Sequence, residues 1–307
     1  MLLHVIHETR YDYAPAVKTA QHMAHLQPAT TETQRLLRQT LDIRPSPAQQ
    51  TEAVDVYGNK RIFFSLRGAH DELQVTATSL VQTSEPPKVT SSLAWEAARE
   101  RLRYHRNAKY DAAAEFVFAS HHVPRHADFL AYAQPSFTRQ RPLHEAACDL
   151  MQRIHADFEF EPSATDVGTP ALQALEMRKG VCQDFAHIML GCLRSMDLPA
   201  RYVSGYLLTE PPPGQPRLVG SDASHAWVSL YLPAAHGRGR WLDLDPTNGR
   251  ATASDFVTVA TGRDYSDVSP LRGVIHGGAR HKMHVAVTVT PVASPTISAA
   301  LSNEGIS

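Results

Sequence analysis

Alternating apolar and polar residues dominate the first 85 or so positions of the chain. Leu73, Val75 and Ala77 alternate with polar neighbours, and the run 61–67 is also rich in strand-forming residues. A period of two is typical of a strand with one buried face. Tyr57-Gly58-Asn59 lies between two such runs and predicts a turn. We therefore expect residues 1–88 to form a β-sandwich-like or barrel-like domain.

Further along, apolar residues recur at spacings of three and four, which indicates helices. The segment 84–88 contains two prolines and is typical of a linker. The two clearest helical faces consist of Leu143, Ala146, Ala147, Leu150, Met151 and Ile154, and of Phe185, Ala186, Met189, Leu190, Leu193 and Met196. We expect an α+β protein: a β-rich domain over 1–88, a core of helices on an antiparallel sheet over 89–275, and a C-terminal strand with a flexible tail over 276–307.

Two alternating segments after residue 224 predict a β-hairpin around a turn that contains Pro and Gly. If Ser229 pairs with Trp241, then His225 lies opposite Asp245. Directly opposed residues are about 5 Å apart, which lets an imidazole and a carboxylate form a hydrogen bond. Asp243 is the alternative acid, one pair further along the same face.

Cys182 stands at the predicted start of a helix, two residues after Gly180, which we expect to end the preceding helix in a left-handed conformation. The unpaired N–H groups of a first turn and the helix dipole favour an anion there, so they favour a thiolate and can help to hold an oxyanion. A lone Cys at such a position is more often a buried apolar side chain. His225 and Asp245 are not needed for packing, however, so the three residues together predict a Cys-His-Asp triad.

Charge and cysteine content narrow the possible partners. The formal net charge of −1 gives no basic surface for nucleic acid. Cys148, Cys182 and Cys192 form no disulfide framework and no Cys-x-x-Cys pair, which is typical of a reducing compartment, and we expect Cys148 and Cys192 to be structural. Charged residues interrupt the first 13 positions, and no apolar run approaches a membrane span. We expect a cytoplasmic protein that binds neither nucleic acid nor membrane.

The 17 histidines are scattered and lack partners at zinc-ligand spacing, so we expect no metal and no cofactor. Sequence leaves the oligomeric state open.

Four motifs lie in order along the second half of the chain: 180–186 with Cys182, 199–206, His225-Ala226-Trp227, and Asp245-Pro246-Thr247-Asn248. Together they resemble the transglutaminase-like superfamily of papain-related cysteine enzymes. The resemblance implies that Cys182, His225 and Asp245 form the triad, and it favours Asp245 over Asp243. Residues 7–28 and 55–64 resemble the β-rich N-terminal domain of bacterial transglutaminase-like proteins, and the run 262–270 is characteristic of those members.

The resemblance implies acyl transfer through a thioester on Cys182. If water resolves the thioester, the enzyme is a protease or amidase; if a primary amine does, it is a protein-glutamine transamidase. We expect hydrolysis of a peptide or protein substrate, with transamidation as one alternative and a non-catalytic peptide-binding module with a vestigial triad as another. Trp227, Tyr206 and Asp184 are candidates to line or brace the substrate cleft.

Overall fold

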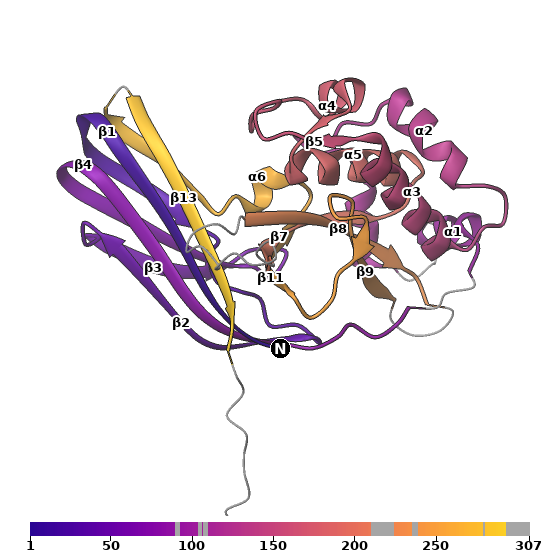
Figure 1. The fold of residues 1–307 in the computed structure, drawn as a ribbon, viewed down its shortest axis with the longest axis horizontal. Coiled ribbons are helices and arrows are strands. Elements are labelled where there is room, and N and C mark those ends of the chain that lie inside the picture. The colour runs from indigo at the N-terminus through magenta and orange to yellow at the C-terminus, as the bar shows by residue number, and fades with distance from the viewer. Residues whose placement is uncertain are drawn as a thin grey trace, which may run out of the picture.

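The computed structural model describes residues 1–89, 93–103, 106, 110–209, 224–234, 239–278 and 280–292. A strand-rich N-terminal part lies beside a core in which helices cover an antiparallel sheet (Figure 1). This arrangement confirms the predicted α+β class. The tail expected to be flexible lies beyond the described residues.

Long, bent strands build the N-terminal sheet. The strands are β1 (Leu2–Ala24), β2 (Gln34–Arg44), β3 (Gln49–Val54), β4 (Lys60–Thr83), β12 (Leu271–Gly277) and β13 (Arg280–Pro291). β1 and β4 pair along most of their length, β2 and β3 pair with the two halves of β4, and β13 and β12 pair with the two halves of β1. The sequence predicts a separate C-terminal strand and tail over 276–307. In the structure this segment contributes β13 to the N-terminal sheet. β12, which lies at the end of the expected core, belongs to the same sheet.

The sheet bends where the β1–β4 register shifts, between Asp12 and Thr19. The break between β12 and β13 lies at the level of this bend. Gly277 and Gly278 there have φ values of 82° and 72°, which favour glycine. The bend lets both halves share one apolar cluster, formed by Tyr13, Val17, Ala20, Ala24, Leu26, Ile43, Phe64, Leu66, Leu73, Val75, Ala77 and Leu271. The sandwich-like character predicted from the alternation therefore comes from one sheet that folds over itself.

The core is built around one enclosed helix, α5 (Cys182–Ser195). All residues from Gln183 to Arg194 are buried, not only the face predicted from the sequence. The five-stranded sheet has the order β10-β9-β8-β7-β11. Its strands are β7 (Ala200–Leu207), β8 (Ser224–Leu232), β9 (Arg240–Asp245), β10 (Arg250–Ala251) and β11 (Phe256–Gly262).

The remaining elements surround α5. They are α1 (Trp95–Leu102), η1 (Ala112–Val117), α2 (Ala127–Ala133), η2 (Gln134–Ser136), α3 (Leu143–Asp157), β5 (Glu159–Phe160), α4 (Ala171–Met177), β6 (Lys179–Gly180) and α6 (Tyr265–Val268). The face predicted for α3 is fully buried. Because α5 packs against β7 and β8 as well as α2, α3 and α4, its first residue has a fixed position.

Two side-chain amides dock the N-terminal part onto β11, an edge strand of the core sheet. The amide of Gln34 donates to the carbonyl of Thr258 and accepts from its N–H, both at 2.7 Å. Asn59 forms the same pair of bonds with Thr261, both at 2.8 Å. The two amides therefore supply hydrogen bonds that a neighbouring strand would otherwise make.

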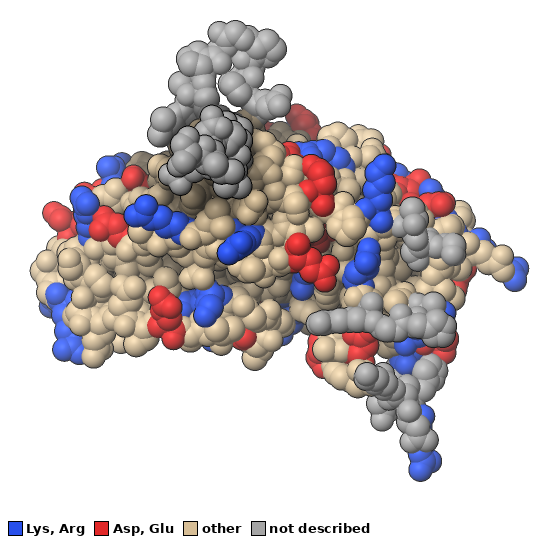
Figure 2. Space-filling view, turned by 90° about the horizontal axis from the view of Figure 1, so that it is seen from below, with Lys and Arg blue, Asp and Glu red and all other residues tan. Residues whose placement is uncertain are grey.

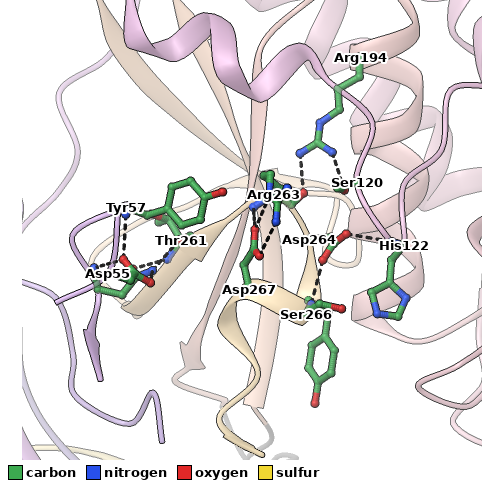
Figure 3. A network of polar contacts seen from close by, with 12 residues as sticks. Asp55, Tyr57, Ser120, His122, Arg194, Thr261, Arg263, Asp264, Ser266 and Asp267 are labelled. Atoms are coloured by element: carbon green, nitrogen blue, oxygen red, sulfur yellow. Dashed lines mark hydrogen bonds and ion pairs between the residues drawn. The ribbon is translucent and has the colours of Figure 1, made fainter. Parts of the chain in front are cut away.

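A polar network joins the far end of α5 to the turn after β11 (Figure 3). Arg194 is buried and donates to the carbonyls of Ala200 and Arg263. Asp264 accepts from the backbone N–H groups of His122 and Ser266, both at 2.9 Å. The run 262–270, singled out in the sequence, thus braces the core, because its carboxylate and carbonyl hold neighbouring segments.

Charges of both signs are interspersed over the face shown in Figure 2, and no large area carries a single sign. No helix among the described residues has both the length and the apolar character needed to cross a membrane.

Candidate active site

Cys182 is the first residue of α5, so the free N–H groups of that first turn lie beside its thiol. The preceding helix, α4, ends at Arg178, whose φ of 57° is left-handed; this is the role predicted for Gly180. Gly180 instead allows close packing, because a Cβ there would lie 2.5 Å from Oδ2 of Asp184. Sγ of Cys182 lies 4.0 Å from the carbonyl oxygen of Ser224, the residue before His225.

The β8–β9 hairpin forms, but its register differs by two residues from the predicted one. Ser229 pairs with Asp243 rather than with Trp241. This register places Leu230 opposite Leu242 on the buried helix side, where the predicted register would have put Arg240. A shift of two residues leaves each side chain on its face, so Asp245 stays on the side of His225 and lies diagonally from it.

The structure brings all three predicted side chains together. Nε2 of His225 donates to Oδ2 of Asp245 at 2.7 Å, and the Cys182 side chain lies close enough to His225 to help raise the pKa of the ring. Because Nε2 is hydrogen-bonded to Asp245, Nδ1 is the ring nitrogen that can interact with the thiol. The Asp245 side chain is fully buried and that of His225 is 10% exposed.

The electrostatics of this contact favour a charged histidine. Burial acts to lower the pKa of His225, but hydrogen bonds with Asp245 and Cys182 outweigh burial and raise the pKa to about 10. Burial acts to raise the pKa of Asp245, but hydrogen bonds from His225 and Asn248 hold it below its usual value. The arrangement can hold an imidazolium between a carboxylate and a sulfur atom.

Asp243, the alternative acid, lies elsewhere on β9. It sits opposite Ser229, and burial raises its pKa although Ser229, Arg201 and Trp227 act to lower it. The hydrogen bond to His225 belongs to Asp245.

The three candidate cleft residues are all buried. Trp227 is 0% exposed and packs edge-on against Phe256 with ring centroids 5.3 Å apart. Tyr206 is 3% exposed, and its hydroxyl lies 2.9 Å from Nδ1 of His7 in the N-terminal part. The structure therefore gives Trp227 a packing role and Tyr206 a role in joining the two parts, and neither lines an open cleft.

Asp184, 1% exposed, braces the start of α5. Its Oδ2 accepts from the Val181 backbone N–H at 2.8 Å and from the Thr165 hydroxyl at 2.6 Å. These bonds secure the residue just before Cys182. Sequence reasoning missed Thr165, because nothing in the chain between positions 165 and 184 indicates that these residues meet.

Asn248 was also missed as a site residue. Its Nδ2 donates to Oδ2 of Asp245 at 2.7 Å. The short spacing of Asn248 from Asp245 within a turn is a signal that could have indicated this contact, because side chains in turns often bond to close neighbours.

The other two cysteines are in different surroundings. Burial raises the pKa of both Cys148 and Cys192. Across the described ranges, no group of three or more His, Cys, Asp and Glu side chains is arranged to hold a metal ion.

Comparison with known proteins places this chain in a family. Residues 3–82 match the bacterial transglutaminase-like N-terminal region, and residues 131–246 match the transglutaminase-like superfamily. An uncharacterised protein of Mycobacterium tuberculosis is 40% identical over 294 residues, which cover 94% of this chain and 92% of the relative. An uncharacterised protein of Mycobacterium leprae is 30% identical over 294 residues, covering 95% and 99% respectively.

A solved structure from Cytophaga hutchinsonii, described as a candidate cysteine protease, has a TM-score of 0.70 at 20% identity and covers 96% of this chain and 92% of that chain. At this identity the likeness concerns the fold alone. Two regions of the chain match the family, and a mycobacterial relative matches nearly its whole length. The chain therefore belongs to the transglutaminase-like superfamily, with the bacterial N-terminal region preceding the superfamily core.

Proposed function

We propose that the protein is a cysteine hydrolase that cleaves peptide or other amide bonds through a thioester on Cys182. The observation that carries the proposal is the contact of His225 with both Cys182 and Asp245, at the N-terminus of the enclosed helix α5. Membership of the superfamily supports an enzyme of the papain-like type.

In the proposed reaction the Cys182 thiolate attacks the carbonyl carbon of the amide. First-turn N–H groups of α5 stabilise the oxyanion, and the His225 imidazolium donates its proton to the leaving amine. The products of this half-reaction are the thioester and a free amine. His225, now neutral, removes a proton from water, which attacks the thioester; the acid and the Cys182 thiolate are released, and the thiolate–imidazolium pair is restored. Asp245 orients the ring throughout.

The first test is the reactivity of the thiol. Brief, limiting iodoacetamide treatment at about pH 6, well below the usual pKa of a free thiol, is followed by peptide mass spectrometry. Cys182 is expected to react faster than Cys148 and Cys192, and to lose that advantage in His225→Ala. Equal, slow labelling of all three thiols would remove the chemical basis of the enzyme and favour a peptide-binding module.

A matched pair of variants tests the assignment of the acid. With an unstructured protein such as casein as substrate, Asp245→Asn is expected to lower the cleavage rate up to about 10⁴-fold, the loss known when a triad acid is replaced by its amide. Asp243→Asn removes a carboxylate from the same strand face without touching His225, and should cleave at the wild-type rate. The reverse ranking would assign the triad to Asp243.

Adding a primary amine to the same reaction separates hydrolysis from transamidation. New peptide termini support the proposed hydrolase, whereas amine incorporated into glutamine side chains supports a transamidase.

We place the enzyme in the cytoplasm, because its three cysteines are all free. Recovery of the protein outside the cytoplasmic fraction of cells would contradict this placement.

A further inference from the structure

The carboxylate of Asp245 is surrounded by hydrogen-bond donors. Oδ1 accepts from the backbone N–H groups of Thr247 at 2.9 Å and Asn248 at 3.2 Å. Oδ2 accepts from Nε2 of His225 and from Nδ2 of Asn248, both at 2.7 Å. A carboxylate accepts about four hydrogen bonds, so each acceptor position is filled. Asn248 contributes through both its backbone and its side chain.

The Asn248 amide also lies against the histidine ring, with Nδ2 3.4 Å from Nε2 of His225. An amide nitrogen only donates, and Nε2 carries the proton given to Asp245, so the two groups do not bond to each other. Both instead point at Oδ2 of Asp245. Together with the two backbone N–H groups on Oδ1, the side chain of Asn248 helps to set the rotation of the carboxylate in which Oδ2 faces the ring, and this leaves Nδ1 for the thiol of Cys182.

Helix α3 holds the turn that carries Asn248. Nδ1 of His155 bonds to the carbonyl of Thr247 at 2.8 Å, and Nε2 of Gln152 donates to the carbonyl of Gly249 at 2.5 Å. Gly249 has φ 62°, and a Cβ there would lie 2.7 Å from the His155 ring. Because the backbone is held on both sides of Asn248, its amide is a donor in a fixed place.

We infer that Asn248 is a positioning residue of the site: its side-chain amide holds the Asp245 carboxylate in the orientation in which His225 presents Nδ1 to Cys182. The inference rests on the proposed function, since it assigns Asn248 to the same reaction. It adds a residue that acts through Asp245 and does not touch the reacting atoms.

The test is the pH profile of Cys182 alkylation by limiting iodoacetamide in wild type, Asn248→Ala and Asn248→Asp. Asn248→Ala is expected to react at least about tenfold more slowly at about pH 6, where the rate depends on the thiolate that His225 stabilises, because a hydrogen bond to a charged group is worth a factor of this order. Asn248 is otherwise exposed, so its replacement should leave the chain folded.

Asn248→Asp gives a signature that a purely structural role would not. In acid the new carboxyl group is protonated and can donate to Asp245, so the rate relative to wild type is expected to recover. As pH rises the new group ionises next to Asp245, and repulsion between the two carboxylates should lower the relative rate. Asn59→Ala, which removes an amide far from the triad, serves as the control and should keep the wild-type rate.

The outcomes separate this inference from the proposed function. If wild-type Cys182 reacts no faster than Cys148, the proposed function fails and the inference fails with it. If wild-type Cys182 is activated while both Asn248 variants keep the wild-type rate and pH profile, the inference is overturned and the hydrolase proposal stands. A lower rate in Asn248→Ala together with acid recovery in Asn248→Asp supports both.

Discussion

At the scale of single residues, His225 combines burial with a raised pKa. It is nearly buried, yet its hydrogen bonds with Asp245 and Cys182 raise its pKa to about 10. A buried cation is unfavourable unless it is paired, so the pair should matter for stability as well as for chemistry. The effect depends on pH, because the pair is charged only while the imidazole is protonated.

A histidine whose pKa is higher in the folded than in the unfolded state adds stability that is complete below the unfolded pKa of about 6.5. This stability is lost as pH rises through the folded value of about 10. The advantage of wild type over His225→Gln in free energy of unfolding should therefore shrink between pH 6 and pH 10, by at least about 1 kcal/mol. Urea unfolding of both proteins at the two pH values measures it; a constant difference would contradict the charged pair.

At the scale of elements, the start of α5 depends on how closely it packs with the residues before it. Asp184 bonds to the Val181 backbone and to Thr165, and Gly180 lies directly against its carboxylate. The sequence predicted a helix start at Cys182 because the apolar pattern begins there. The sequence also predicted that Gly180 ends the preceding helix, whereas the structure shows that it allows close packing. A helix end and a close contact both favour glycine, so the residue type alone does not distinguish them.

Gly180→Ala is expected to lower the free energy of unfolding by about 1–3 kcal/mol, since the added methyl group overlaps Asp184 and forces the start of α5 to move. Gly168→Ala is the matched control, because a Cβ there meets Asp166 only at 3.4 Å. Its change should stay within about 0.5 kcal/mol. Equal stability of the two variants in urea unfolding would show that the contact at Gly180 is easily relieved.

At the scale of the whole molecule, strands near the two ends of the chain join the N-terminal part to the core. β12 and β13 return from the core to pair with β1, and Gln34 and Asn59 bond to the edge strand β11. Leu3, Val5 and Val81 of the N-terminal sheet belong to the same apolar cluster as the core helices. We therefore expect the two parts to unfold together.

Gln34→Ala and Asn59→Ala should each lower the free energy of unfolding by about 1–3 kcal/mol, because each leaves a backbone N–H of β11 without its partner. Gln39→Ala, which loses one bond to the carbonyl of Leu26 within the N-terminal part, should change stability by less than about 0.5 kcal/mol. Calorimetry checks both the size of the loss and the number of transitions. Two separate transitions in wild type would show that the parts fold independently.

The sequence alone determined the class of fold and the residue types of the site. Periodicities of two and of three to four depend on neighbours along the chain, so the strands around Val75 and the helices around Leu150 and Met189 could be predicted locally. The order of motifs around Cys182, His225 and Asp245 indicated the family, which sequence matches to known proteins bear out.

The tertiary structure decided what depends on distant residues. The hairpin register followed from burying Leu230 against Leu242, and it put Asp245 diagonally from His225. Tyr206 and Trp227 lie in interior contacts because the N-terminal part and Phe256 cover them. Such contacts join segments far apart in the chain, and their geometry is fixed only when the whole core packs, which no local pattern can express.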